Sequence, residues 1–204
     1  MMDKIAKAIS LILNPVFMPL IGIYLIFQTN RFSYLVPQQI FTIYLVIVFF
    51  SILVPLSLFP LLTVWKLIGS IHLNERKDRF IPLTISTVCF YITHFLMVKM
   101  GAPKLMVLFT FSISLSTLSV LLITIFWKIS LHLTGIGGIT ALILSLVFYN
   151  QSGFFAWLVV FFVLSGLLAS VRLYLQVHSL AQVGAGFAVG FLCVLLTFLY
   201  FPLY

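Results

Sequence analysis

Two side chains near the end of the sequence, Arg172 and His178, are of types that bind and transfer phosphate. They lie six residues apart, which is about 600° around an uninterrupted helix, so on one helix they would point in different directions. A break between Gln176 and Ser179 would let them converge. Ser179 and Gln182 have the S-x-x-Q spacing of a capping box, which would put His178 just before a helix N-terminus, where anions bind. The spacing therefore predicts a phosphate site, with the planar donor fork of Arg172 on the phosphate oxygens.

A second histidine, His132, follows Lys128 and Ser130 at the start of an apolar run. Lys128 offers a cation and Ser130 a hydroxyl to the same phosphate. Imidazole titrates near neutrality, so one histidine can act as a nucleophile while the other donates a proton. His178 and His132 are therefore a candidate nucleophile and acid for phosphoryl transfer.

The region from about residue 70 to the C-terminus resembles the type-2 phosphatidate phosphatase superfamily, whose members carry three short motifs. The second family motif is P-S-G-H, of which this chain keeps Ser130 and His132. The third motif is S-R, five residues, H, three residues and D. Here Arg172 and His178 match it, and Gln182 stands where the family has Asp. The three motifs follow one another in the family's order.

The first family motif, which is K, six residues and R-P, is matched less closely. Arg79 stands at the Arg position, His72 lies seven residues before it, and Pro82 follows three residues later. Arg76 and Lys77 offer the cation that the motif otherwise lacks. The alternative interpretation of this cluster is a set of ordinary interfacial charges that bind lipid headgroups.

The resemblance implies a lipid phosphatase that works through a phosphohistidine and needs no metal or other cofactor. His178 would attack phosphorus, and His132 would protonate the leaving oxygen and then activate water. The resemblance also implies a group of side chains that hold the phosphate oxygens, namely Arg172, Arg79, Lys77 and Ser130.

Gln182 would orient the imidazole of His178, as Asp does in the family, but without a charge. In serine proteases the comparable loss of an Asp costs about 10⁴ in rate. Two further interpretations are open: Gln182 only caps the helix, or the protein is a catalytically silent relative that binds anionic lipid or serves as an assembly partner. Ser130 is likewise either a phosphate ligand or a helix cap.

The composition indicates where such a site must lie. Of 204 residues, 63% are hydrophobic and 7% are charged, against about 25% charged in soluble domains. The chain is therefore expected to be one integral membrane domain, residues 1–204, with membrane lipids and a phosphorylated lipid substrate as its partners. The net charge of +8 points to anionic headgroups rather than to nucleic acid. Asp3, Glu75 and Asp78 are the only acidic residues, and none lies inside an apolar run, so a carboxylate metal cluster within the membrane is excluded.

Continuous apolar runs predict an all-α, polytopic transmembrane helix bundle of six to seven spans. The runs cover approximately residues 8–28, 37–66, 80–99, 104–127, 133–150, 154–175 and 180–203. An even number of crossings separates the polar segments around Arg79, His132 and His178, so these segments are expected at the same face of the membrane. Pro55 and Pro60 predict a kink in the second and longest run.

Other polar or small residues are expected to be structural. His94 lies in the middle of a run and is interpreted as a core histidine bonded to a neighbouring helix, and Gly186 with Gly190 as a G-x-x-x-G helix contact. A small-molecule transporter is the third functional class, disfavoured by the single polar face. The expected location is the inner (cell) membrane of a bacterium. Either face can carry the site, because the basic residues outside the site divide evenly between the faces.

Overall fold

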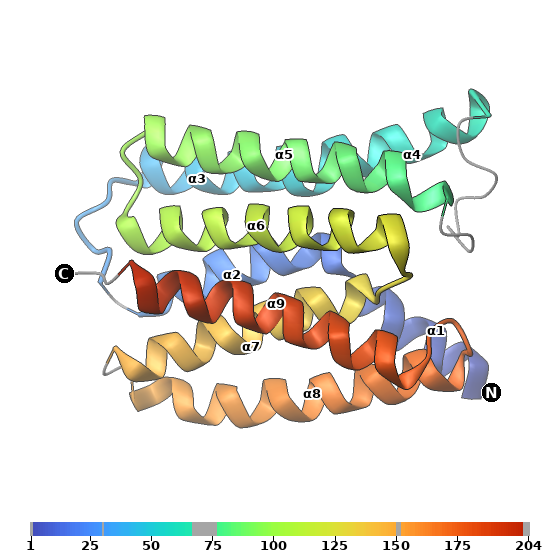
Figure 1. Cartoon of the computed structure of the whole chain (residues 1–204). Coiled ribbons are helices and arrows are strands. Elements are labelled where there is room, and N and C mark those ends of the chain that lie inside the picture. The colour runs from blue at the N-terminus through green and yellow to red at the C-terminus, as the bar shows by residue number, and fades with distance from the viewer. Residues whose placement is uncertain (1, 30, 67–76, 150–151, 202–204) are drawn as a thin grey trace.

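The computed structural model describes residues 2–29, 31–66, 77–149 and 152–201. Its elements in these ranges are helices, without a strand among them, and seven helical stretches are long and apolar enough to cross a membrane (Figure 1). The prediction of an all-α membrane bundle is therefore confirmed, and the seven stretches indicate an integral membrane protein. The α-helices are α1 (Met2–Ile12), α2 (Met18–Phe27), α3 (Pro37–Val48), α4 (Val54–Val64), α5 (Phe80–Lys99), α6 (Lys104–Phe126), α7 (Leu131–Phe148), α8 (Phe155–Tyr174) and α9 (Leu180–Tyr200).

The first span is interrupted between α1 and α2. Asn14 is extended (φ −67°, ψ 135°) and its Oδ1 accepts a hydrogen bond from the Val16 amide at 3.0 Å. Pro15 has no amide hydrogen and opens the short 3₁₀ helix η1 (Pro15–Phe17). The helix also begins at Met2, several residues before the apolar run that predicted it, because a helical turn does not require apolar side chains.

The second span is interrupted by a π-helix, η2 (Phe49–Leu53), between α3 and α4. Pro55 cannot donate to the carbonyl of Ser51, four residues before it, so the α-helical hydrogen-bond ladder fails at this position. The Val54 amide instead donates to the Phe49 carbonyl, five residues back. The kink predicted for this run is thus a π-helix immediately before Pro55, whereas Pro60 lies inside α4.

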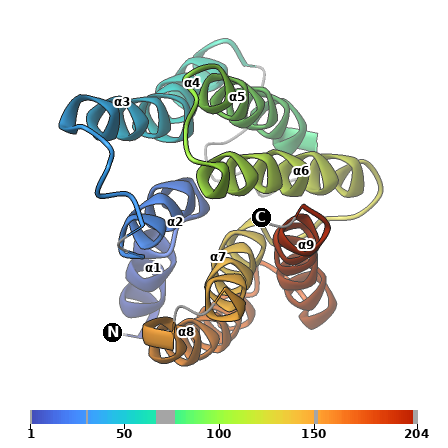
Figure 2. The same ribbon diagram turned by 90° about the vertical axis from the view of Figure 1, so that its left-hand side faces the viewer.

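The most buried helix is α7, which lies between α2, α6, α8 and α9 (Figure 2). Glycines allow α9 to approach α7 closely. An added Cβ at Gly190 would overlap the carbonyl oxygen of Thr134, and one at Gly186 would lie 2.5 Å from the carbonyl oxygen of Ser130. The expected G-x-x-x-G contact is therefore confirmed.

We expect Gly190→Ala to lower the thermal stability of the detergent-solubilised protein, whereas Gly184→Ala on the same helix is expected to leave it unchanged or slightly raised. The new methyl group at position 190 meets the backbone of α7, which cannot move aside, and such overpacking costs about 1–3 kcal/mol. At Gly184 nothing lies within 4 Å of an added Cβ. Differential scanning fluorimetry would measure both variants, and equal melting temperatures would contradict the close α7–α9 contact.

The three polar segments lie at one end of the bundle. The start of α5, the α6–α7 connection and the α8–α9 connection meet there, together with the N-terminal half of α1 (Figure 1). This arrangement confirms the placement inferred from counting crossings, and it brings the candidate residues of all three motifs into the same region.

Candidate functional site

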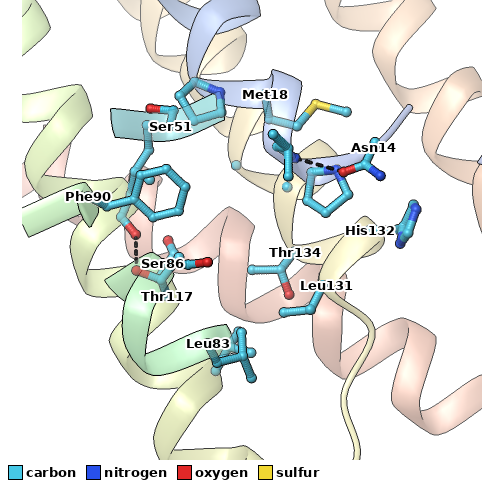
Figure 3. A pocket seen from close by; sticks show the side chains of 18 of the residues that line it. Asn14, Met18, Ser51, Leu83, Ser86, Phe90, Thr117, Leu131, His132 and Thr134 are labelled. Atoms are coloured by element: carbon cyan, nitrogen blue, oxygen red, sulfur yellow. Dashed lines mark hydrogen bonds between the residues drawn. The ribbon is translucent and has the colours of Figure 1, made fainter. Parts of the chain in front are cut away.

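A cavity of about 520 Å³ reaches from the end of the bundle that carries the polar segments into its interior. Its wall includes four nitrogen-bearing side chains of the predicted site, Arg79, His132, Arg172 and His178. Most of the remaining wall is apolar and is built by the interrupted first two spans and by α5, α6 and α7. Figure 3 shows His132 beside Asn14 on one wall, with Phe90 on the opposite wall. The cavity therefore joins a cationic end to an apolar interior.

Two hydrogen bonds tie the three motif segments together, one from a side chain and one from a backbone amide. Nη1 of Arg79 donates to the carbonyl oxygen of Ile129 at 3.3 Å, which links the first segment to the second. The Ser130 amide donates to the carbonyl oxygen of Gln182 at 3.2 Å, which links the second segment to the third. One residue of the cavity wall, Arg79, thus also joins two of the motif segments.

The break between Arg172 and His178 is present. Helix α8 ends at Tyr174, Gln176 adopts a left-handed conformation (φ 53°), and Ser179 caps α9. The capping box is complete, because the backbone amide of Gln182 donates to Ser179 Oγ at 3.4 Å and the backbone amide of Ser179 donates to Gln182 Oε1 at 3.2 Å. The prediction that a helix break lets Arg172 and His178 converge is confirmed.

Gln182 contacts both His178 and the N-cap residue Ser179. Its Oε1, which accepts from the Ser179 amide, also lies 3.0 Å from Nδ1 of His178. An amide N–H can only donate, so this atom of Gln182 must be the oxygen, and Nδ1 of His178 must carry a hydrogen. Nε2 of His178 therefore holds a lone pair in the neutral ring, as a nucleophile requires.

Burial is the main influence on the charge of His178. The side chain is 8% exposed. Its pKa is lowered from 6.5 to about 4, mainly by burial and also by the charges of Arg79, Arg172 and Lys128, while the hydrogen bond to Gln182 acts in the opposite direction. Burial and then the charge of Arg172 likewise lower the pKa of Arg79 to about 10, so Arg79 stays a cation at neutral pH. The site therefore combines a neutral imidazole with two guanidinium cations.

A histidine NMR titration of the detergent-solubilised protein is expected to give His178 a pKa near 4, with the hydrogen on Nδ1 above that pH. The signal would be assigned by its absence in His178→Gln. Unfolding exposes a ring that takes up a proton below pH 6.5, whereas the folded ring does so only near pH 4. The contribution of His178 to stability therefore falls as the pH falls from 6.5 to 4. A pKa near 6.5 would contradict the buried, Gln182-bonded ring.

Ser10 of α1 contacts both Arg172 and His132, and the sequence alone did not identify Ser10 as part of the site. Nη1 of Arg172 donates to Ser10 Oγ at 2.8 Å, and Nε2 of His132 lies 3.1 Å from the Ser10 carbonyl oxygen and 3.3 Å from Oγ. Within the described chain, Nε of Arg172 is buried and has no hydrogen-bond partner. No spacing in the sequence signals Ser10, because its contact depends on how α1 packs against α8.

Two of the remaining predicted phosphate ligands, Ser130 and Lys128, are not among the described residues that line the cavity. Ser130 is fully buried as the N-cap of α7, and its hydroxyl has no hydrogen-bond partner among the described residues. Lys128 lies near the site, where burial and the charges of Arg79 and Arg172 lower its pKa. The side chain of Lys77 lies outside what the structure describes, as do Arg76 and His72 entirely.

His94 lies on α5, away from the cavity wall. Its Nδ1 is 3.5 Å from the hydroxyl of Thr110 on α6, and its ring packs against Phe111. The interpretation of His94 as a core histidine bonded to a neighbouring helix is therefore confirmed. Among residues 2–29, 31–66, 77–149 and 152–201, no three side chains of the metal-binding types His, Cys, Asp and Glu lie together.

No protein-family model, curated protein or solved structure matches the chain. The resemblance to the phosphatase superfamily therefore rests on the motif residues, and the chemistry of the site must be argued from their geometry.

Proposed function

We propose that this protein is an integral membrane phosphatase that hydrolyses a phosphate monoester or diphosphate of a lipid through a phosphohistidine on His178. The observation that carries the proposal is the buried Nε of Arg172, which has no acceptor among the described residues. A buried charged donor without an acceptor costs about 1–3 kcal/mol or more. A phosphate offers the oxygens that this nitrogen lacks, and it would lie in the cavity that Arg172 shares with the neutral ring of His178.

In the proposed reaction, the Nε2 lone pair of His178 attacks phosphorus in line with the leaving oxygen. The P–N bond forms as the P–O bond to the lipid breaks, and the leaving oxygen takes a proton from the imidazolium form of His132, which becomes a neutral ring. Water then gives a proton to His132 and attacks phosphorus, which breaks the P–N bond and releases phosphate. Arg172 and Arg79 stabilise the charge that develops on the nonbridging oxygens. The family pattern adds Lys77 and Ser130 to this group as candidates, and Lys128 is a further candidate because its cation lies near the site.

The cavity wall supports a lipid as the substrate. Apolar side chains from several helices, among them Phe90, Phe109 and Ile113, lie beyond the cationic end, where a hydrocarbon tail fits better than water does. The proposed location is a bacterial inner (cell) membrane, since the spanning proteins of the outer membrane are β-barrels. The partners are then membrane lipids and a phosphorylated lipid.

The second candidate function is a catalytically silent protein that binds anionic lipid or acts as an assembly partner. The observation in its favour is Gln182, an uncharged residue at the position where the family has Asp. A neutral partner gives less stabilisation to the positive ring of a phosphohistidine than a carboxylate does. Such a protein would bind phosphate in the same cavity and release none.

Phosphate release by the detergent-purified full chain tests the proposal. Phosphatidic acid, lysophosphatidic acid and an isoprenyl diphosphate would be supplied as substrates. Both His178→Ala and His132→Ala are expected to lose activity, whereas His94→Ala, which removes a histidine away from the cavity, is expected to keep it. Activity that survives both cavity substitutions would overturn the proposal, and phosphate binding without release by the wild type would favour the silent alternative.

Gln182→Glu is expected to raise kcat by about fivefold, because a charged acceptor strengthens the hydrogen bond to His178 by roughly 1 kcal/mol. The gain is far smaller than the serine protease comparison suggests, since Gln182 already selects the Nδ1–H form of the ring. Glu keeps the length of Gln and so keeps both hydrogen bonds. Gln176→Glu adds the same charge at an exposed position of the same connection and is the matched control. A kcat that does not rise would contradict an orienting role for residue 182.

A further inference from the structure

Ser10 has no part in the proposed reaction, yet it contacts two groups that the reaction uses. Its hydroxyl oxygen accepts from Arg172 Nη1 at 2.8 Å. Its carbonyl oxygen lies 3.1 Å from Nε2 of His132, and a carbonyl can only accept, so Nε2 must carry a hydrogen that it donates to Ser10. Two oxygens of one residue thus occupy donors of both Arg172 and His132.

These donors are the ones that a bound phosphate ester needs. Arg172 would donate to a nonbridging oxygen, and the Nε2 hydrogen of His132 would pass to the leaving oxygen. A hydrogen directed at the Ser10 carbonyl is not directed at a substrate oxygen. The substrate and Ser10 therefore compete for the Nε2 hydrogen of His132 and for Nη1 of Arg172, whereas Nε of Arg172 stays open to phosphate.

Helix α1, which carries Ser10, packs mainly on one neighbour, α8, where the Tyr174 hydroxyl also donates to Asp3 Oδ1 at 3.0 Å. Of the eleven residues of α1 only Ala6 is buried. The helix ends at Ile12, after which the extended Asn14 and Pro15 separate it from α2. Helix α2 contributes Ile23, Leu25 and Ile26 to the core, so α1 can swing while α2 stays in place.

We propose that α1 is a gate over the site, closed by the contacts of Ser10 with Arg172 and His132 and opened when a phosphate group displaces Ser10. This inference rests on the proposed function for its substrate, but the competition itself concerns phosphate binding. Ser10 in this role lowers the affinity for phosphate rather than supporting it. The direction of its effect separates a gate from a structural support.

The first test compares the full-length wild type with Ser10→Ala in detergent. The gate predicts that loss of the hydroxyl lowers both the dissociation constant of inorganic phosphate and the KM for lysophosphatidic acid by about fivefold to tenfold, the value of one hydrogen bond. Ser170→Ala is the matched control, since Ser170 is exposed on α8 and bonds within its own helix. Unchanged or weaker phosphate binding by Ser10→Ala would overturn the gate.

A second test needs no substitution. Hydrogen exchange of the wild type is expected to become faster in α1 when inorganic phosphate is added, whereas bound ligands ordinarily slow exchange. Slower exchange in α1 would overturn the gate.

Failure of the gate and failure of the phosphatase proposal give different results. Turnover by the wild type together with a raised KM in Ser10→Ala would leave the enzyme and remove the gate. Tighter phosphate binding by Ser10→Ala without turnover in either protein would leave the gate and remove the enzyme. Absence of phosphate binding in both proteins would overturn both.

Discussion

His178→Ala is expected to reduce kcat for phosphate release by about 10⁴- to 10⁶-fold, the range seen when the nucleophile of a covalent mechanism is removed. The imidazole supplies the atom that bonds to phosphorus. The other imidazole of the described cavity wall, His132, has the role of the acid in the proposed reaction, and both guanidiniums are cations. The KM is expected to change little, since the cations that bind phosphate remain. Rapid-quench measurements with ³²P-labelled substrate should also show that labelled protein disappears with the activity.

The control for this loss is His94→Ala, which leaves the cavity wall intact. Equal activity in His178→Ala and His94→Ala would rule out a phosphohistidine at position 178. A loss in His178→Ala with labelled protein still formed would place the nucleophile elsewhere, and His132 would then be the first residue to test.

Arg172→Lys is expected to lower kcat/KM by about 10²- to 10³-fold, the usual effect of removing one donor that stabilises transition-state charge. Lys keeps the positive charge but has no counterpart of Nε, the buried nitrogen that lacks an acceptor in the described chain. It also has no planar fork to place two donors on two phosphate oxygens at once. The effect should therefore divide between a higher KM and a lower kcat, rather than fall on KM alone.

Arg31→Lys is the control for this substitution. Arg31 also donates to a backbone carbonyl, that of Tyr149 at 3.0 Å, but it lies outside the cavity wall. We expect Arg31→Lys to keep kcat/KM within about twofold of the wild type, as surface substitutions commonly do. If Arg172→Lys behaved in the same way, the role of the guanidinium fork in phosphate binding would be disproved.

The spans could be predicted from the sequence because continuous apolar runs have few alternatives in a membrane. The same holds for the meeting of the three polar segments, which follows from counting crossings, and for the break before α9, which the S-x-x-Q spacing of Ser179 and Gln182 predicts. Each of these features depends on local composition or on topology alone. They were enough to place Arg79, His132, Arg172 and His178 at one end of the bundle.

The rest of the site depends on packing that no spacing records. Ser10 reaches Arg172 and His132 only because α1 lies against α8 after the turn at Asn14 and Pro15. Ser130 is buried instead of facing the cavity because α9 approaches its backbone at Gly186. The prolines predicted an irregular second span, but the choice of a π-helix depends on which carbonyl the Val54 amide can reach.

In the proposed enzyme, the shared oxygen of Gln182 would make catalysis depend on the integrity of the first turn of α9. If the first turn of α9 frays, the Ser179 amide and the ring of His178 lose their common acceptor together, and the imidazole becomes able to rotate. A local opening that leaves the bundle intact would then be sufficient to silence the nucleophile. The working temperature range of the protein would be set by this turn, at a lower temperature than the one at which the whole bundle unfolds.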